Sequence, residues 1–249
     1  MKILAVDTAS SNCSIAIVEA SNNKFNILAE ENNSDAKTHS QKLMPMVKNI
    51  FDKLATSLDD INLIACCTGP GSFTGIRIGI ATCKAFVDSK NILATGVSSL
   101  ESLAHNVETP GYIISLLDCK NENVYGSLYF HDESGYTKIS DFMADNISNV
   151  LNTFLSKISK NQTITFVGYA ALIYKDLIEK TFTKNSIVFS SNNTQSAVSL
   201  AKCAYNNFLN KKTGDSSVLS PLYLRASQAE RMLKEKKNSW IFQKWHLMI

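Results

Sequence analysis

The chain has 249 residues, of which 45% are hydrophobic and 19% are charged, as is usual for a soluble globular protein. Its formal net charge of +3 is too small to indicate nucleic-acid binding, and no apolar run approaches the roughly 18 residues of a membrane-spanning helix. Asp7 interrupts the first short apolar run, which argues against a signal peptide, so we expect a cytoplasmic protein.

The first half of the chain predicts strands alternating with helices. Apolar residues recur at helical spacing from residue 39 onward, and Ser98 with Glu101 three residues later has the pattern of a capping box. The expected elements are strands at 2–7, 12–19 and 25–30, a helix at 39–55, a strand at 61–68, a helix at 74–87, a strand at 91–97 and a helix at 98–107.

The second half repeats this order more loosely. The expected elements are a hairpin of strands at 112–118 and 123–130, a helix at 145–158, a strand with a glycine turn at 163–171, a helix to about 182, a strand at 186–191, a helix at 195–210 and an extended segment at 220–225. The repeated order predicts an α/β fold of two lobes built on one plan, although the two halves show no sequence repeat.

The same order predicts how the chain is divided. We expect a first lobe over 1–108, completed by part of the helix near 195–210, and a second, smaller lobe over 109–194. A closing helix and short strand would occupy 195–225, and 226–249 would form a tail. A local excess of basic residues at 225–237 indicates a solvated helix or a contact with RNA or an acidic partner.

The glycine-rich stretch "TGPGSFTGIRIGIATCKAFV" (68–87) resembles a phosphate loop at first sight. It lacks the GxxxxGK[ST] spacing of a Walker A loop and the GxGxxG spacing of a dinucleotide fold. Gly75, Gly79 and Cys83 instead fall on one face of a helix, which favours close packing, either inside the chain or against a partner helix. Ser72 or Thr74 is expected to cap this helix, and Arg77 to contact a partner carboxylate or solvent.

Outside this stretch, few residues indicate a metal-binding or phosphate-binding site. Asp7 precedes a hydroxyl-rich "TASS" turn, but this turn lacks the glycines that usually let amides approach a phosphate, so a capped turn is favoured. Asp118 would be a second carboxylate across a cleft or simply a turn residue. Neither an HxxxH nor a CxxC motif occurs, so we expect no metal site and interpret the six cysteines as reduced core residues.

Five blocks together resemble the bacterial TsaB family, also called YeaZ: "ILAVDTASSNCSIAIVE", "HSQKLMPMV", "GPGSFTGIRIGIATCKAF", "LLDCKNENVY" and "PLYLR". They occur in family order over about residues 3–225. The resemblance implies an actin-like fold, of the Hsp70 and sugar-kinase type, with two ribonuclease-H-like lobes. It also implies a part in forming threonylcarbamoyladenosine beside the anticodon of tRNAs that read codons beginning with A.

The resemblance further implies that the chain does not catalyse the transfer itself. Such proteins act as a scaffold for the paralogous catalytic subunit TsaD, with the ATPase TsaE, and pair with themselves when the partner is absent. TsaD binds its metal through an HxxxH motif, whereas His39 is followed four places on by Leu43. No cofactor is expected on this chain alone, although ATP or ADP at the interface of the complex is compatible with the resemblance, and tRNA would be reached only through the complex.

Two sets of site residues follow from the motifs and the resemblance. The expected partner interface comprises His39, Leu43, Met46, Val47, Ile50, Gly69, Pro70, Gly71, Ser72, Phe73, Thr74, Gly75, Ile76, Arg77, Gly79, Ile80 and Cys83. A candidate vestigial nucleotide site comprises Asp7, Thr8, Ser10 and Asp118.

The sequence departs from the family pattern at two places. Cys119, Lys120 and Asn123 replace the usual alanine, arginine and glutamate, and "VGYAA" (167–171) lacks a second glycine. A nucleotide role for the second lobe is therefore not supported. An autonomous actin-like ATPase or a protease remains the alternative function, although no Ser/His/Asp set favours the protease.

Overall fold

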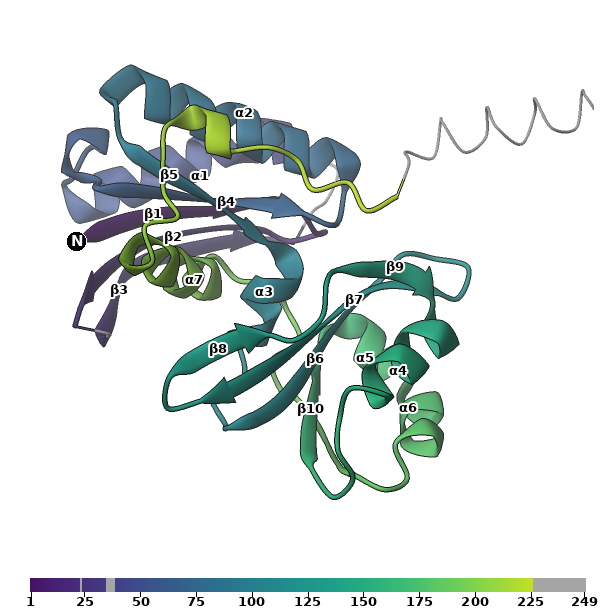
Figure 1. The fold of residues 1–249 in the computed structure, drawn as a ribbon. Helices are drawn as coiled ribbons and strands as arrows, with labels where there is room; N and C mark the ends of the chain where they lie inside the picture. Colours follow the sequence, from purple (N-terminus) through teal and green to yellow (C-terminus); the bar gives the residue numbers. More distant parts are fainter. Residues whose placement is uncertain (23, 35–38, 226–249) are drawn as a thin grey trace, which may run out of the picture.

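The computed structural model describes residues 1–22, 24–34 and 39–225, and within them the chain forms two α/β lobes (Figure 1). The strands of the first lobe are β1 (Lys2–Asp7), β2 (Cys13–Ser21), β3 (Lys24–Asn33), β4 (Leu63–Gly69) and β5 (Leu93–Ser98). They form one sheet in the order β3-β2-β1-β4-β5, in which β1 is antiparallel to β2 and parallel to β4.

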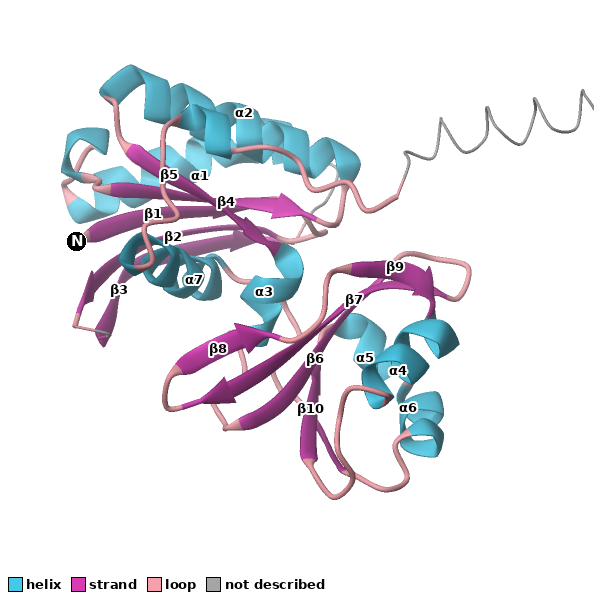
Figure 2. Ribbon diagram, in the orientation of Figure 1, coloured by secondary structure: helices cyan, strands magenta, loops and turns pink. Residues whose placement is uncertain are grey.

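Helices cover both faces of this first sheet. Its long helices are α1 (His39–Leu54), α2 (Phe73–Lys90) and α7 (Ala197–Leu209). The first two lie on one face and α7 lies on the other, where it contacts β1 and β2 (Figure 2). Strands between two helical layers are apolar on both faces, which is why β1 and β4 are buried along almost their whole length.

The second lobe repeats the topology of the first. Its strands are β6 (Gly111–Asp118), β7 (Asn123–Asp132), β8 (Gly135–Lys138), β9 (Met143–Asn146), β10 (Thr163–Val167) and β11 (Ser186–Phe189). The sheet order is β11-β10-β6-β7-β8, and β9 pairs with β7. If β9 is left out and the second sheet is read from β8, its strands follow the order third, second, first, fourth, fifth, which is the order of the first sheet. This match confirms the prediction of two α/β lobes on one plan.

A short helix, α3 (Ser99–Ala104), lies between the two sheets (Figure 1). It contacts β6 and β7 of the second lobe as well as β4, β5 and α7 of the first. Ser98 caps it by accepting a hydrogen bond from the Glu101 backbone N–H at 3.0 Å, as the capping pattern predicts. A small apolar cluster joins the lobes here, formed by Leu103, Ala104, Val107, Ile113, Tyr129 and Val167.

Helices α4 (Ile147–Leu155), α5 (Tyr169–Ile173) and α6 (Lys175–Thr181) pack in the second lobe. Fifteen of its buried apolar residues form a separate core, in which Phe166 and Phe182 meet edge to face with ring centroids 5.2 Å apart. Each lobe therefore has its own core. The helices found among the described residues include none that is long and apolar enough to cross a membrane.

Several predicted boundaries are wrong for local reasons. The segment expected as strand 163–171 ends at Val167, because Gly168 has φ 103° and turns the chain into α5. The short strands β8 and β9 were not predicted, and 220–225 forms no strand ladder. The basic segment at 225–237, apart from Arg225, lies outside the described residues.

Candidate functional site

The turn after β1 and the loop before α2 are joined by hydrogen bonds inside the chain. The Ser72 N–H donates to the Ala9 carbonyl at 2.7 Å, and the Thr8 hydroxyl donates to the Gly75 carbonyl at 2.7 Å. The Ala9 N–H donates to Oδ1 of Asp7 at 2.9 Å. The Thr8 hydroxyl and the Ala9 N–H of this turn are therefore bonded to the chain itself.

The glycines of the 68–87 stretch permit this contact. A Cβ at Gly71 would lie 2.1 Å from the Ala9 carbonyl oxygen, and one at Gly75 would lie 2.0 Å from that of Thr8. At Gly79 the nearest atom would be Oγ1 of Thr8, at 2.3 Å. Of the two kinds of packing that the spacing left open, close approach inside the chain accounts for these glycines.

Helix α2 begins with its own cap. The Ser72 hydroxyl accepts a hydrogen bond from the Gly75 N–H at 3.2 Å, so Ser72 rather than Thr74 is the capping residue. The helix ends at Lys90, after which Asn91 adopts the left-handed conformation that commonly terminates helices. The stretch is thus a capped helix start pressed against the β1–β2 turn, which agrees with its failure to match the phosphate-loop motifs.

Asp7 is fully buried beneath this turn. Desolvation raises the pKa of its carboxyl to about 6, although the hydrogen bond from Ala9 works in the opposite direction. Its Oδ2 has no hydrogen-bond partner among the described residues. The His39 ring is also buried, and its Nε2 donates to the Ser10 carbonyl at 2.9 Å, which fixes the turn from the α1 side.

Asp118 lies in a different environment. It is exposed at the end of β6 and accepts a hydrogen bond from the Lys120 N–H at 3.3 Å, the role of a turn residue. Ser10 likewise closes its own turn through the backbone of Asn12. The described part of the chain contains no cluster of three or more side chains suited to a metal ion.

Most of the predicted interface residues are not available at the surface. The apolar stripes of α1 and α2 face the sheet of their own lobe, because helical spacing of apolar residues marks the core side of a helix. Twelve of the predicted residues are buried: His39, Leu43, Met46, Val47, Ile50, Gly69, Pro70, Gly75, Ile76, Gly79, Ile80 and Cys83. Those at least partly exposed are Gly71, Ser72, Phe73, Thr74 and Arg77. A partner could contact only this second group without rearrangement.

The exposed part of α2 carries an aromatic and cationic cluster, which we call the α2 cluster: Phe73, Arg77 and Tyr223. The rings of Phe73 and Tyr223 stack with centroids 4.5 Å apart. The Arg77 guanidinium lies 4.0 Å from the Phe73 centroid, and its Nε–H donates to the Tyr223 hydroxyl at 2.8 Å. Arg77 therefore contacts its own chain. Tyr223 could not be predicted from the sequence, because its partners are about 150 residues away along the chain.

Tyr223 belongs to an extended segment that runs along the molecule from the first lobe toward the second. The Leu222 N–H donates to the Thr68 carbonyl at 2.8 Å. Farther on, the Arg225 guanidinium donates to Sγ of Cys119 at 2.6 Å, in the turn between β6 and β7. The "PLYLR" block thus ties α2 to the second lobe, at one of the positions where this sequence departs from the family pattern.

The described cysteines are all free, and five of the six are buried, as predicted. Burial is the main cause that raises the pKa of the thiols of Cys67 and Cys203. Only Cys119 is partly exposed.

Comparison with known proteins agrees with this fold. A family model described as TsaD, tRNA N6-adenosine threonylcarbamoyltransferase, matches residues 26–233. The Bacillus subtilis tRNA threonylcarbamoyladenosine biosynthesis protein TsaB is 29% identical over 92% of this chain and 96% of its own. The corresponding protein of Buchnera aphidicola subsp. Baizongia pistaciae is 30% identical over 89% of this chain and 97% of its own.

Solved structures show the same architecture. YeaZ from Pseudomonas aeruginosa superposes with a TM-score of 0.72 at 19% identity, over 90% of this chain and 99% of that one. A second structure from that organism, described as similar to the peptidase YeaZ, gives a TM-score of 0.75 at 20% identity. Its coverage of the two chains is the same, 90% and 99%. The order of elements, the capped glycine helix and the near-complete matches lead to one conclusion: this chain belongs to the TsaB family.

Proposed function

We propose that this chain is a non-catalytic scaffold subunit that binds and stabilises a TsaD-type catalytic paralogue in the formation of threonylcarbamoyladenosine in tRNA. The observation that carries the proposal is the closed β1–β2 turn. Asp7 is buried, and Thr8 and Ala9 are hydrogen-bonded to α2. The tRNA pathway is taken from the names of the relatives.

The scaffold role requires a surface for the catalytic subunit. We place it at the exposed edge of α1 and α2, where the α2 cluster lies and where Met44 is 50% exposed. Aromatic and arginine side chains in a cluster are the groups that most often dominate binding energy at protein interfaces. A TsaE-type ATPase, a homodimer in the absence of the partner, and ATP or ADP at the interface of the complex belong to the same proposal.

Activity measurements test the proposal that the chain is not catalytic by itself. The purified chain alone should neither hydrolyse ATP above a protein-free blank nor transfer threonylcarbamoyl groups to tRNA, and transfer should require both subunits. The opposite outcome, ATP turnover by the chain alone that is lost in Asp7→Asn, would support the autonomous ATPase instead. Peptide cleavage by the chain alone would support the protease.

Calorimetry tests the binding surface. Arg77→Ala should weaken binding to the catalytic subunit about tenfold or more, because it removes the cation and releases the rings that it orders. Lys157→Ala is the matched control, since Lys157 is an exposed cation of the second lobe. Equal affinities of the two variants would place the partner surface elsewhere on the molecule.

A further inference from the structure

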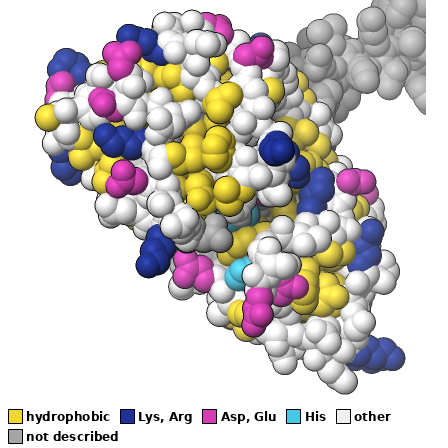
Figure 3. Space-filling model, turned by 60° about the vertical axis from the view of Figure 1, so that its left-hand side comes forward, with side chains coloured by type: hydrophobic (Ala, Val, Ile, Leu, Met, Phe, Trp, Pro, Cys, Tyr) yellow, Lys and Arg dark blue, Asp and Glu magenta, His cyan; other side chains and the backbone are white. Residues whose placement is uncertain are grey.

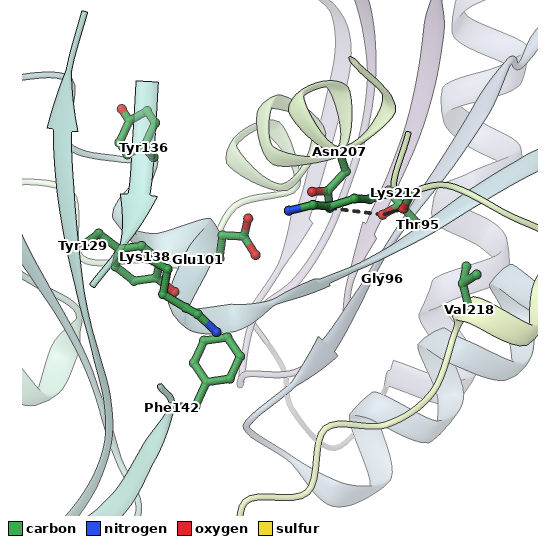
Figure 4. A pocket seen from close by; sticks show the side chains of 10 residues that line it. All are labelled: Thr95, Gly96, Glu101, Tyr129, Tyr136, Lys138, Phe142, Asn207, Lys212 and Val218. Carbon is green, nitrogen blue, oxygen red and sulfur yellow. Dashed lines mark hydrogen bonds between the residues drawn. The ribbon is translucent and has the colours of Figure 1, made fainter. Parts of the chain in front are cut away.

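A polar pocket of about 400 Å³ lies at the side of the molecule where the two lobes meet. None of the residues that line it belongs to the β1–β2 turn. Figure 3 shows this side, with charged and histidine side chains gathered where the lobes meet. The pocket is lined from both lobes, by β5, α3 and the end of α7 on one side and by β7, β8 and the residues after β8 on the other (Figure 4). Its size is in the usual range for a small-molecule site.

Three charged side chains reach this pocket from different elements. Glu101 comes from α3, Lys138 from β8 and Lys212 from the segment after α7 (Figure 4). Within the part of the chain that the structure describes, neither Glu101 nor Lys212 forms an ion pair. Lys138 pairs only with Asp141, at 3.8 Å, and Asp141 is fully exposed to solvent. The three charges therefore line one pocket without forming ion pairs with one another.

A buried hydroxyl group at this site also lacks a well-formed hydrogen bond. Tyr129 lines the pocket and is only 2% exposed, and its Oη lies near the hydroxyls of Ser98 and Ser127 without a well-formed hydrogen bond to either. An unpaired buried hydroxyl costs about 1–3 kcal/mol, so such groups usually have a partner. On the opposite wall, Thr95 and Asn207 are held in place by a mutual hydrogen bond of 3.1 Å (Figure 4).

The aromatic rings of the pocket offer little space for a flat ligand. Tyr136 is stacked between two imidazole rings, with centroids 3.8 Å from His105 and 4.0 Å from His131. The Phe142 ring is covered on one face by the Lys138 ammonium, 4.5 Å from its centroid. Recognition at this site would therefore depend on charge and hydrogen bonds rather than on stacking.

We propose that this pocket binds an acidic α-amino acid. Two lysines and one glutamate give the lining a net charge of +1, which complements an amino acid with a net charge of −1. The ammonium group of the ligand would face Glu101, and its two carboxylates would face Lys138 and Lys212. Because the lining comes from both lobes, the bound ligand would also hold the lobes in one relative orientation.

Thermal unfolding of the full chain tests this site with L-aspartate and L-glutamate as probes and L-lysine as the charge-reversed control. Either acidic amino acid, added at a concentration ten times its Kd for the chain, should raise the Tm of the chain by about 3–5 °C, since a ligand stabilises the state that it binds. L-Lysine should give no shift. Failure of both acidic probes, or an equal shift with L-lysine, would overturn the proposal.

Two variants with matched controls locate the effect. Glu101→Gln removes the negative charge from the pocket lining and keeps the size of the side chain. Lys212→Met removes a positive charge from an exposed residue of the same lining. Each should reduce the ligand-induced shift by at least half, whereas the exposed controls Glu133→Gln and Lys157→Met should keep it. If Glu101→Gln unfolds, Lys212→Met alone decides. A shift retained in Lys212→Met would refute binding in this pocket.

Discussion

The glycine helix gives the sharpest prediction, because the structure says which atom a new methyl group would meet. In Gly75→Ala the added Cβ would lie 2.0 Å from the backbone oxygen of Thr8, and a backbone atom cannot rotate away. Helix α2 would have to move by about 1 Å, because non-bonded carbon and oxygen atoms require more than 3 Å. The movement would weaken two short hydrogen bonds, Ser72 to Ala9 and Thr8 to Gly75.

The magnitude follows from opposing effects. Alanine gains about 1 kcal/mol over glycine from helix propensity. Overpacking costs about 1–3 kcal/mol, and each weakened buried hydrogen bond costs about 1 kcal/mol or more. We therefore expect Gly75→Ala to lower the free energy of unfolding by about 2–4 kcal/mol, measured by urea denaturation. Asp88→Ala, at an exposed position of the same helix, should change it by less than about 0.5 kcal/mol.

A second glycine provides an internal check. At Gly79 the obstructing atom is the side-chain oxygen of Thr8, 2.3 Å from the added Cβ. Gly79→Ala should therefore cost clearly less in a Thr8→Ala background than alone, whereas Gly75→Ala, which meets the backbone, should not be rescued. A Gly75→Ala protein as stable as the wild type, or more stable, would refute this explanation of the glycines.

Two further predictions concern titration and thiol reactivity. The pKa of the Asp7 carboxyl is about 6 in the folded state and 3.8 in the unfolded state. The protonated carboxyl therefore adds to the free energy of unfolding at low pH, and this contribution, on the order of 3 kcal/mol, is lost as pH rises from 3.8 to about 6. The pKa of the His105 ring is lowered from 6.5 to about 4 by burial. The contribution of the neutral ring to the free energy of unfolding is therefore lost as pH falls from 6.5 to about 4. Urea denaturation at pH 4.5 and 7.5 should therefore show little net change in the wild type but a clear gain of stability with pH in Asp7→Asn; identical pH profiles would contradict the assignment. Native protein should expose about one rapidly reacting thiol to a disulfide reagent, and Cys119→Ser should remove it; a rapid phase that persists would show that a buried cysteine is accessible.

The sequence predicts well those features that depend on neighbours along the chain. The apolar runs of β1 and β4 and the capping of α3 by Ser98 follow from local spacing. For α2 the sequence left the cap open between Ser72 and Thr74, and the structure shows that Ser72 is the cap. The short strands β8 and β9 were missed because four residues of mixed character carry no clear periodicity. They form because β7 offers an edge with which to pair.

The candidate sites were harder to predict for a different reason. Spacing shows that Gly75 and Gly79 share a helix face, but it does not show whether that face meets the same chain or another. The apolar stripe of α1 was assigned to a partner although it forms the core side of the helix. The stacking of Phe73 on Tyr223 and the pocket around Glu101 join residues far apart in sequence, so only the folded chain reveals them.

The structure also links the proposed partner surface to the rest of the molecule. The exposed face of α2 carries Arg77, while its buried face rests on Thr8 of the β1–β2 turn. The same helix is tied to the second lobe through Tyr223 and Arg225. A subunit bound to α2 would therefore contact an element whose position is set by both lobes. That arrangement suits a scaffold, because interfaces built on rigid, internally supported elements lose less conformational entropy when they bind.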